Sequence, residues 1–231
     1  LLLLLSCSPT EPVQNINDDL VLQEFINNSL TTLTPSLDSD SSGTVEPREL
    51  GIQEWENGRI TKLNCYNIGL SGQIPESIGQ LTELTQLSLK NNFLSGEIPK
   101  SIGNLKKLTQ LSFAENNLSG TIPDEIVNLI SLIRLDISNN ALTGDIPNNI
   151  GNLFAINTLL LDSNKFNGII PDGICNLYNS NKEFNLSNNQ FCHSLPICIN
   201  APKNIGFQNC DTSCIDGFSN INGYCYSLKD I

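Results

Sequence analysis

Oxygen-bearing side chains recur at fixed spacing in the stretch DSDSSGTVEPRE, residues 38–49. Counted from Asp38 as position 1, carboxylates or hydroxyls stand at positions 1, 3, 5, 9 and 12, and Gly43 at position 6 permits a sharp turn. Hard oxygen ligands at this spacing wrap around one calcium ion, with the position-7 carbonyl as a further ligand. The sequence therefore predicts a Ca²⁺ site made of Asp38, Asp40, Ser42, Thr44, Glu46 and Glu49.

This spacing resembles the loop of an EF-hand. Pro35 before the loop and Gly51 after it leave no room for the two long helices of a complete EF-hand domain. We therefore expect a stabilising calcium clasp of extracellular-type affinity. The alternative is a solvated acidic loop, because Asp, Ser and Gly also favour turns.

The remaining chemistry-bearing residues give no catalytic pattern. His193 is the only histidine and stands beside Cys192, but adjacent side chains of a strand or turn point apart. The sequence has no G-x-S-x-G, no phosphate-binding loop, and too few histidines for a zinc site. We predict that the protein is not an enzyme.

The charge of the chain restricts its partners. Its 231 residues include 24 acidic and 12 basic side chains, a formal charge of −12. Such a charge repels phosphate backbones and anionic lipid headgroups. We therefore exclude nucleic acid as a partner and expect contact with a membrane only through a lipid anchor.

The first residues have the character of an export signal. Leu1 to Leu5 suit the end of a secretory apolar region, and the chain has no methionine, so we expect the numbered start to be a truncation. LLSC resembles a bacterial lipoprotein box, which implies lipidation of Cys7; the alternative is an ordinary signal-peptide tail with an incidental cysteine. We predict a truncated signal peptide at 1–7 and a polar tether at 8–17.

The rest of the chain repeats one phrase every 24 residues. LSGEIPKSIGNL at 94–105 has close copies before and after it. The fixed leucines of the phrase are Leu81, Leu105, Leu129, Leu153 and Leu177. Such a period predicts a solenoid, here of about six coils over residues 60–200.

Each coil begins with an LxL core whose apolar and polar residues alternate, as in a strand buried on one face. Stacked coils then pair these strands into a parallel sheet. An asparagine follows three residues after the second apolar position, where its donors and acceptor could satisfy buried backbone groups. These asparagines are Asn92, Asn116, Asn140, Asn164 and Asn189.

The wording LxxLxLxxNxLSGxIPxxIGNL resembles the plant-specific class of leucine-rich repeats. This class occurs in receptor-kinase ectodomains, polygalacturonase-inhibiting proteins and bacterial surface proteins, and the leader makes this chain most similar to a bacterial cell-surface lipoprotein. The resemblance implies an α/β solenoid: a right-handed arc with a parallel sheet on the concave face and a short extra strand after LSG on the convex side.

Two caps are expected to close the solenoid. The N-terminal cap, 18–59, contains a helix with Leu22, Phe25 and Ile26 on one face, followed by the acidic loop. The cysteine pair that usually precedes the first plant-type repeat is missing, and we interpret Cys65 as a buried free thiol. The C-terminal cap, 201–231, is cysteine-rich. We expect disulfides of unassigned pairing, or partial pairing, among Cys175, Cys192, Cys198, Cys210, Cys214 and Cys225.

Function is expected on the exposed face of the sheet, which carries the residues between the leucines. Lys62, Lys90 and Arg134 form a mild basic stripe there, and a mixed polar and apolar surface suits a protein or polysaccharide ligand. The predicted ligand-binding residues are Lys62, Asn64, Tyr66, Gln86, Lys90, Gln110, Glu115, Arg134, Asp136, Leu160 and Asp162.

The sequence thus favours a monomeric, non-enzymatic binding module that is exported and either lipid-anchored at the cell surface or outer membrane, or secreted. One alternative is a polygalacturonase-inhibitor-like blocker of a secreted hydrolase or a plant-type receptor ectodomain, which N-glycosylation sequons at Asn27, Asn117 and Asn185 would suit. Another is a structural or adhesive surface protein, including one that faces ice.

Overall fold

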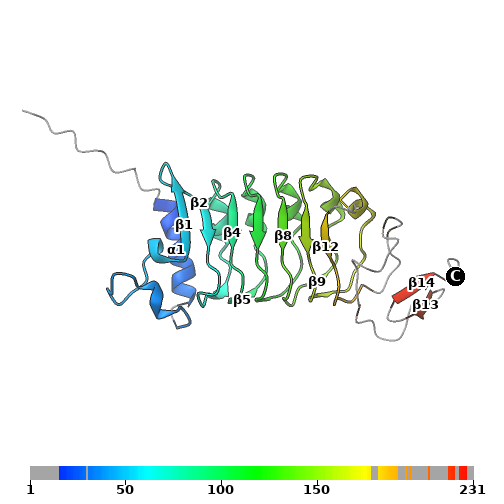
Figure 1. The fold of residues 1–231 in the computed structure, drawn as a ribbon, viewed down its shortest axis with the longest axis horizontal. Helices are drawn as coiled ribbons and strands as arrows, with labels where there is room; N and C mark the ends of the chain where they lie inside the picture. The colour runs from blue at the N-terminus through cyan, green and yellow to red at the C-terminus, as the bar shows by residue number, and fades with distance from the viewer. Residues whose placement is uncertain are drawn as a thin grey trace, which may run out of the picture.

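The repeats stack into an elongated solenoid (Figure 1). The computed structural model describes residues 16–29, 31–177 and 182–191, the single residues 196, 198 and 208, and strands at 218–221 and 224–227. Residues 1–15, with the predicted lipidation site Cys7 and most of the tether, lie outside this part of the chain. Within it, no helix is both long and apolar enough to cross a membrane.

A seven-stranded sheet runs the length of the solenoid in the order β1-β2-β4-β6-β8-β10-β12. The six strands from β2 onward are parallel and in register, so that each LxL core lies beside the next. The strands are β1 (Ile52–Glu56), β2 (Arg59–Asn64), β4 (Gln86–Ser88), β6 (Gln110–Ser112), β8 (Arg134–Asp136), β10 (Thr158–Leu160) and β12 (Glu183–Asn185). We call the outward surface of this sheet the concave face.

β1 was not predicted from the sequence. It pairs with β2 in antiparallel fashion, through a turn at Asn57 and Gly58, whose φ angles of 51° and 75° suit a tight hairpin. The hairpin adds one antiparallel strand to the N-terminal edge of an otherwise parallel sheet.

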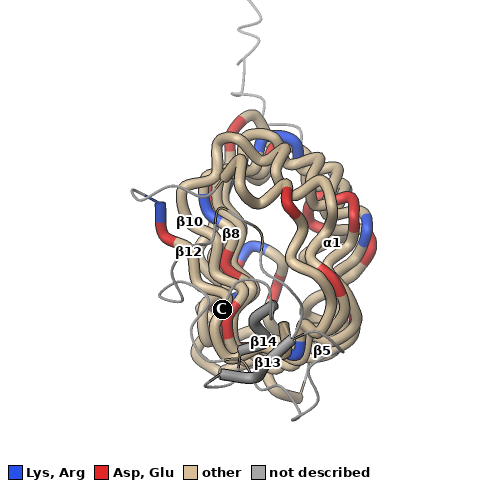
Figure 2. The backbone as a smooth tube through the Cα atoms, turned by 90° about the vertical axis from the view of Figure 1, so that its right-hand side faces the viewer, with Lys and Arg blue, Asp and Glu red and all other residues tan. Residues whose placement is uncertain are grey.

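Short strands and 3₁₀ helices form the other walls of each coil. Figure 2 looks along the solenoid and places the large sheet on one side, with α1 and β5 on the other. The predicted extra strand is present, but on the LSG residues themselves. The small strands are β3 (Ser71–Gln73), β5 (Phe93–Gly96) and β7 (Asn117–Leu118) in one sheet and β9 (Thr143–Gly144) and β11 (Lys165–Phe166) in another. The 3₁₀ helices are η3 (Glu76–Gln80), η4 (Lys100–Asn104), η5 (Asp124–Asn128), η6 (Asn148–Asn152) and η7 (Asp172–Asn176).

The core is a continuous stack of repeated apolar side chains. In the coil that contains β4, Leu84, Leu87 and Leu89 enter from the sheet side, and Ile98 and Ile102 enter from the opposite wall. All five are buried, and burial of such a side chain contributes about 1.5–3 kcal/mol. Each coil buries this surface only against its neighbours, so the coils are stable as a stack.

The predicted asparagine ladder is confirmed. Asn92 donates to the carbonyls of Cys65, Leu89 and Lys90 at 2.7, 2.9 and 3.2 Å, and its Oδ1 accepts from the amides of Gly69 and Leu70 at 3.0 Å. The same pattern recurs at Asn116, Asn140, Asn164 and Asn189. One side chain per coil therefore satisfies backbone groups of two adjacent coils.

The N-terminal end is covered by α1 (Ile16–Ser29). Leu22, Phe25 and Ile26 are buried as predicted, and the helix ends well before Pro35. Asp18, in the first turn of the helix, is fully buried, and its Oδ2 accepts from Arg59 Nε and from the amide of Ile60, both at 2.9 Å. This ion pair fastens the cap to the first repeat strand.

Between α1 and β1 the acidic loop follows the single-turn helix η1 (Pro35–Leu37) and ends in a second one, η2 (Pro47–Glu49). Cys65 is buried and free, as predicted, and burial raises the pKa of its thiol, so it remains protonated at neutral pH. At the other end, β13 (Phe218–Ile221) and β14 (Tyr224–Ser227) form an antiparallel pair.

Candidate ligand-binding face and acidic loop

The concave face carries every ligand-binding residue predicted from the sequence. Strand alternation sends the leucines inward and their neighbours outward, so residues at equivalent positions of successive strands form rows across the sheet. Asn64, Tyr66, Gln110 and Glu115 are exposed, and the others except Asp136 are partly exposed. In-register pairing, for example of Lys62 with Gln86, brings side chains 24 residues apart to adjacent positions.

The three cations of the predicted basic stripe lie on the concave face, but each of them is paired with a carboxylate. Lys62 Nζ lies 2.8 Å from Glu54 and Lys90 Nζ lies 3.0 Å from Glu115. Arg134 contacts Asp136 at 3.1 Å and Glu183 at 3.5 Å. The register of the strands places acids beside these bases, so the stripe offers no free positive charge.

Between the paired cations lies a neutral depression of about 280 Å³. Its polar lining comes from Asn64, Gln86, Ser88, Gln110 and Ser112, with Lys62 and Arg134 at its two ends. Ser112 Oγ is buried and has no hydrogen-bond partner among the described residues. The depression therefore presents amides and hydroxyls, which both donate and accept hydrogen bonds.

The C-terminal half of the face is acidic. Asp136 is only 4% exposed, contrary to the free contact we expected, since it is held by Arg134 and accepts from the Ser138 hydroxyl at 2.7 Å. Asp162 is half-buried on the next coil. Burial, and secondarily the negative charge of Asp136, raise the pKa of Asp162.

The N-terminal end of the face carries two exposed apolar or aromatic side chains beside the Lys62–Glu54 ion pair. Tyr66 is 53% exposed, and Ile52 on β1 is 72% exposed opposite Asn64 in the hairpin register. Ile52 and Glu54 were missed in the sequence, because we placed residues 18–59 in a cap. The dipeptide Asn57-Gly58 between two strand-like segments is the signal that could have revealed them.

The acidic loop gathers three of its six predicted calcium ligands. One carboxylate oxygen each from Asp38, Asp40 and Glu49 lies within 4.8 Å of the others. The amide of Ser39 donates to Glu49 at 2.8 Å and its hydroxyl donates at 2.5 Å. Donation from Ser39 and from the amide of Glu46 lowers the pKa of Glu49 to about 2, so this carboxylate is charged at neutral pH.

The other three predicted ligands bond to one another. Ser42 Oγ donates to the Thr44 carbonyl at 3.0 Å, and the Thr44 hydroxyl donates to Glu46 Oε1 at 2.8 Å. These oxygens lie on the same loop as the carboxylate cluster. The donor set is therefore all oxygen and suits a hard cation.

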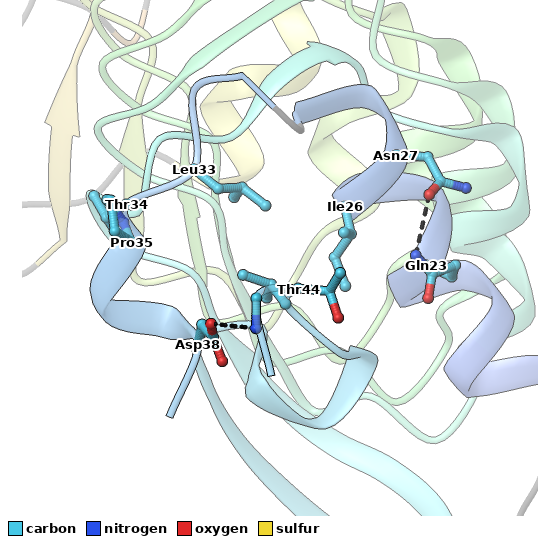
Figure 3. Close-up of a pocket in the computed structure, with 10 residues that line it drawn as sticks. Gln23, Ile26, Asn27, Leu33, Thr34, Pro35, Asp38 and Thr44 are labelled. Atoms are coloured by element: carbon cyan, nitrogen blue, oxygen red, sulfur yellow. Dashed lines mark hydrogen bonds between the residues drawn. The ribbon is translucent and has the colours of Figure 1, made fainter. Parts of the chain in front are cut away.

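A cavity of about 490 Å³ lies between this loop and α1 (Figure 3). Ile26 of the helix and Leu33 and Val45 of the following segment give it apolar walls. The loop contributes Asp38, whose Oδ2 accepts from the Gly43 amide at 2.9 Å. The acidic loop thus forms one wall of the cavity.

One predicted disulfide is present, between Cys175 and Cys198, with a Cα–Cα distance of 5.5 Å. It ties η7 to the segment after β12. Cys192, Cys210 and Cys214 lie outside the described residues, as does His193, and for Cys225 on β14 only the backbone is described.

Comparison with known proteins supports the repeat assignment. Residues 83–105, 107–129, 131–153 and 155–177 each match the Leucine Rich Repeat family. A search of curated proteins gave no significant match.

Solved structures with this fold include plant receptor ectodomains. The chain is 34% identical over 73% of its length to a chain from the complex of the Arabidopsis receptor kinase HAESA with the peptide hormone IDA and the co-receptor SERK1, at a TM-score of 0.62. It is 32% identical over 76% of its length to a plant ice-binding protein, at a TM-score of 0.63, and covers 57% of that chain. It spans only 27% of the HAESA-complex chain and 15% of the Arabidopsis thaliana GASSHO1/SCHENGEN3 ectodomain.

A chain of similar size comes from the Arabidopsis thaliana BIR3–SERK2 complex. The identity is 30%, the TM-score is 0.60, and the match covers 78% of this chain and 97% of the other. With four matched repeats and this near-complete coverage of a relative, the chain belongs to the leucine-rich repeat family.

Proposed function

We propose that this protein is a non-enzymatic binding module that holds an extended segment of a partner protein on its concave face. The neutral depression is the observation that carries this proposal. Its amides and hydroxyls, from Asn64 to Ser112, offer both donors and acceptors to the amide and carbonyl groups of an extended backbone.

The solved relatives support a protein ligand over a polysaccharide. HAESA is described in complex with a peptide hormone, and RGFR1 is a plant peptide hormone receptor described in complex with RGF2. The sheet face here has the same architecture, and the polar side chains that line its depression between Lys62 and Arg134 are uncharged.

A steric block tests the site. Gln110 is exposed at the depression, so Gln110→Trp should fill it without disturbing the core, while Gln80→Trp places the same bulk at an exposed position of η3. Peptides selected from a random ten-residue display library on the unmodified protein should bind Gln110→Trp at least about tenfold more weakly and Gln80→Trp equally. Equal peptide binding by both variants would place the site elsewhere. If Gln110→Trp lost binding to a polysaccharide on an array but kept its binding to peptides, a glycan ligand would be favoured.

The acidic loop is proposed to bind one structural Ca²⁺ ion through Asp38, Asp40 and Glu49, with Ser42, Thr44 and Glu46 completing the oxygen set. Convergence of the three carboxylates is the supporting observation. An ion there would neutralise these mutually repelling charges and brace the wall of the adjacent cavity.

For location, we propose export and attachment at the cell surface through a lipid on Cys7. The leader sequence is the support for this proposal. Metabolic labelling with a fatty acid should mark the full-length protein and should fail for Cys7→Ser. Glycosylation at Asn117 of the native protein, with no acyl label, would favour the receptor-type alternative instead.

A second candidate, attachment to a solid surface such as ice, draws on the similarity to the plant ice-binding protein. The small sheets carry a ladder of hydroxyls, in which Ser95, Ser119 and Thr143 donate to glycine carbonyls one coil earlier at 3.4, 3.4 and 3.1 Å. Inhibition of ice recrystallisation by the protein, lost in Ser119→Lys but kept in Gln110→Trp, would support this function over the first.

A further inference from the structure

Acidic groups outnumber basic groups on the concave face. The strands and their C-terminal extensions present three cations, Lys62, Lys90 and Arg134, and all three are engaged in ion pairs. Their partners are Glu54, Glu115, Asp136 and Glu183, and Asp162 is a fifth carboxylate on the same face. The surplus charge of the face is therefore negative.

Asp162 is the carboxylate without a cationic partner. Among the described residues no Lys or Arg nitrogen lies within 4.0 Å of it, and its carboxylate accepts hydrogen bonds from its own backbone amide and, at 3.4 Å, from the Ser163 hydroxyl. Lys182 precedes β12, at the opposite end of the strands, and Arg134 is already shared by Asp136 and Glu183. A nearby opposite charge favours the ionised form of a carboxylate, so a cation from another molecule would stabilise the half-buried anion at this position.

The surroundings of Asp162 match the shape of a basic side chain. Leu160 lies two residues earlier on the same face and is partly exposed, in register with Asp136 on one side and Asn185 on the other. The methylene stem of a lysine or arginine packs on an apolar surface of this kind while its charged end reaches a carboxylate.

The distance between Asp162 and Tyr66 indicates how long a peptide must be to contact both residues. Asp162 and exposed Tyr66 occupy the same position in coils four repeats apart, which at strand spacing is roughly 19 Å. An extended peptide covers this distance in about six residues, and the neutral depression lies between the two ends.

We infer that the concave face selects an extended, cationic peptide segment that places a Lys or Arg against Asp162 and an apolar residue near Tyr66 and Ile52, about six positions away. This inference rests on the proposed function and specifies the chemical class of its partner.

Pairs of variants test the assignment directly. Peptides selected from the ten-residue library on the unmodified protein should be enriched in Lys and Arg. In a selected peptide, exchange of the critical lysine for norleucine should weaken binding about tenfold to the unmodified protein and less than about twofold to Asp162→Asn. Asp124→Asn, an equal charge change at an exposed position on η5, is the matched control and should retain the tenfold effect.

The outcomes separate this inference from the proposed function. Two outcomes would overturn the cationic preference alone. In the first, the selected peptides bind Gln110→Trp more weakly but are not enriched in Lys and Arg. In the second, exchange of lysine for norleucine weakens binding equally to Asp162→Asn and Asp124→Asn. Binding that is indifferent to Gln110→Trp would overturn the concave site itself. Thermal melting of each variant confirms that the fold is retained.

Discussion

Glu49 and Asp162 are two carboxylates whose pKa values shift in opposite directions for identifiable reasons. Donors from Ser39 and Glu46 stabilise the charged form of Glu49, whereas burial and the neighbouring Asp136 disfavour the charged form of Asp162. A lowered native pKa stabilises the fold above the unfolded-state pKa, and a raised native pKa stabilises it below that value. The two residues should therefore respond differently to pH.

For Glu49, the stabilising contribution is lost as pH falls from about 4.5 toward about 2. Binding of Ca²⁺ to its loop should at neutral pH add about 1.4–2.7 kcal/mol of unfolding free energy at ion concentrations 10 to 100 times the Kd. We expect millimolar Ca²⁺ to raise the Tm of the unmodified protein and to leave the Tm of Glu49→Gln unchanged. Glu76→Gln, at an exposed position of η3, is the control and should respond to Ca²⁺ like the unmodified protein. A Tm that Ca²⁺ does not move would rule the ion site out.

For Asp162, the raised pKa means that its ionised form destabilises the fold above that pKa. Asp162→Asn should increase the free energy of unfolding at pH 7 by a modest amount, about 0.5 kcal/mol, because it removes one unpaired charge on the surface. The gain should shrink as pH falls, since protonation of Asp162 then removes the same charge. Urea titrations at pH 7 and pH 4 measure the difference; a destabilised variant at pH 7 would contradict the assignment.

At the scale of the secondary-structure elements, the asparagine ladder links each strand to the next coil. Asn116 donates to the carbonyls of Leu89, Phe113 and Ala114 at 2.9–3.2 Å and accepts from the amide of Leu94 at 3.0 Å. Because these backbone groups have few alternatives in the core, truncation leaves several of them unsatisfied.

Asn116→Ala should therefore reduce the free energy of unfolding by about 3 kcal/mol. Asn117→Ala, one residue later at an exposed position, should change it by less than about 0.5 kcal/mol. The midpoint of urea unfolding compares the two, and similar midpoints would mean that water replaces the ladder bonds at little cost.

How far the sequence predicts these elements depends on whether the signal repeats. The LxL strands, the buried leucines and the asparagines recur every 24 residues, so agreement across coils identified them. β1 occurs once and has no counterpart in the repeats. The pairing of Lys90 with Glu115 depends on side chains from neighbouring coils meeting across the sheet, and spacing along the chain gives no direct sign of it.

The whole molecule is a stack whose first coil depends on its cap. Asp18 is buried, and Arg59 is the cation that compensates it while also donating to the Gln80 carbonyl at 2.9 Å. Removal of one partner of a buried ion pair leaves an uncompensated charge, which is far more costly than loss of an exposed pair.

Arg59→Ala should therefore lower the free energy of unfolding by about 3–5 kcal/mol. Lys107→Ala, which breaks the exposed pair with Glu83, should lower it by less than about 1 kcal/mol. In native-state hydrogen exchange, Arg59→Ala should reduce the protection of the backbone amides of α1 and β2 more than that of β8 and β10. An equal loss of amide protection in all coils would indicate that the cap and the repeats unfold as one unit.

Matching registers from β2 to β12 make one coil interchangeable with another. Excision or duplication of a complete 24-residue unit rejoins equivalent neighbours, so the length of the binding surface varies in whole steps of about 4.8 Å. If the unit is removed or added between Tyr66 and Asp162, the preferred separation of the apolar and cationic residues in the ligand should change by one to two positions. The residues that contact the two ends of the ligand would stay the same.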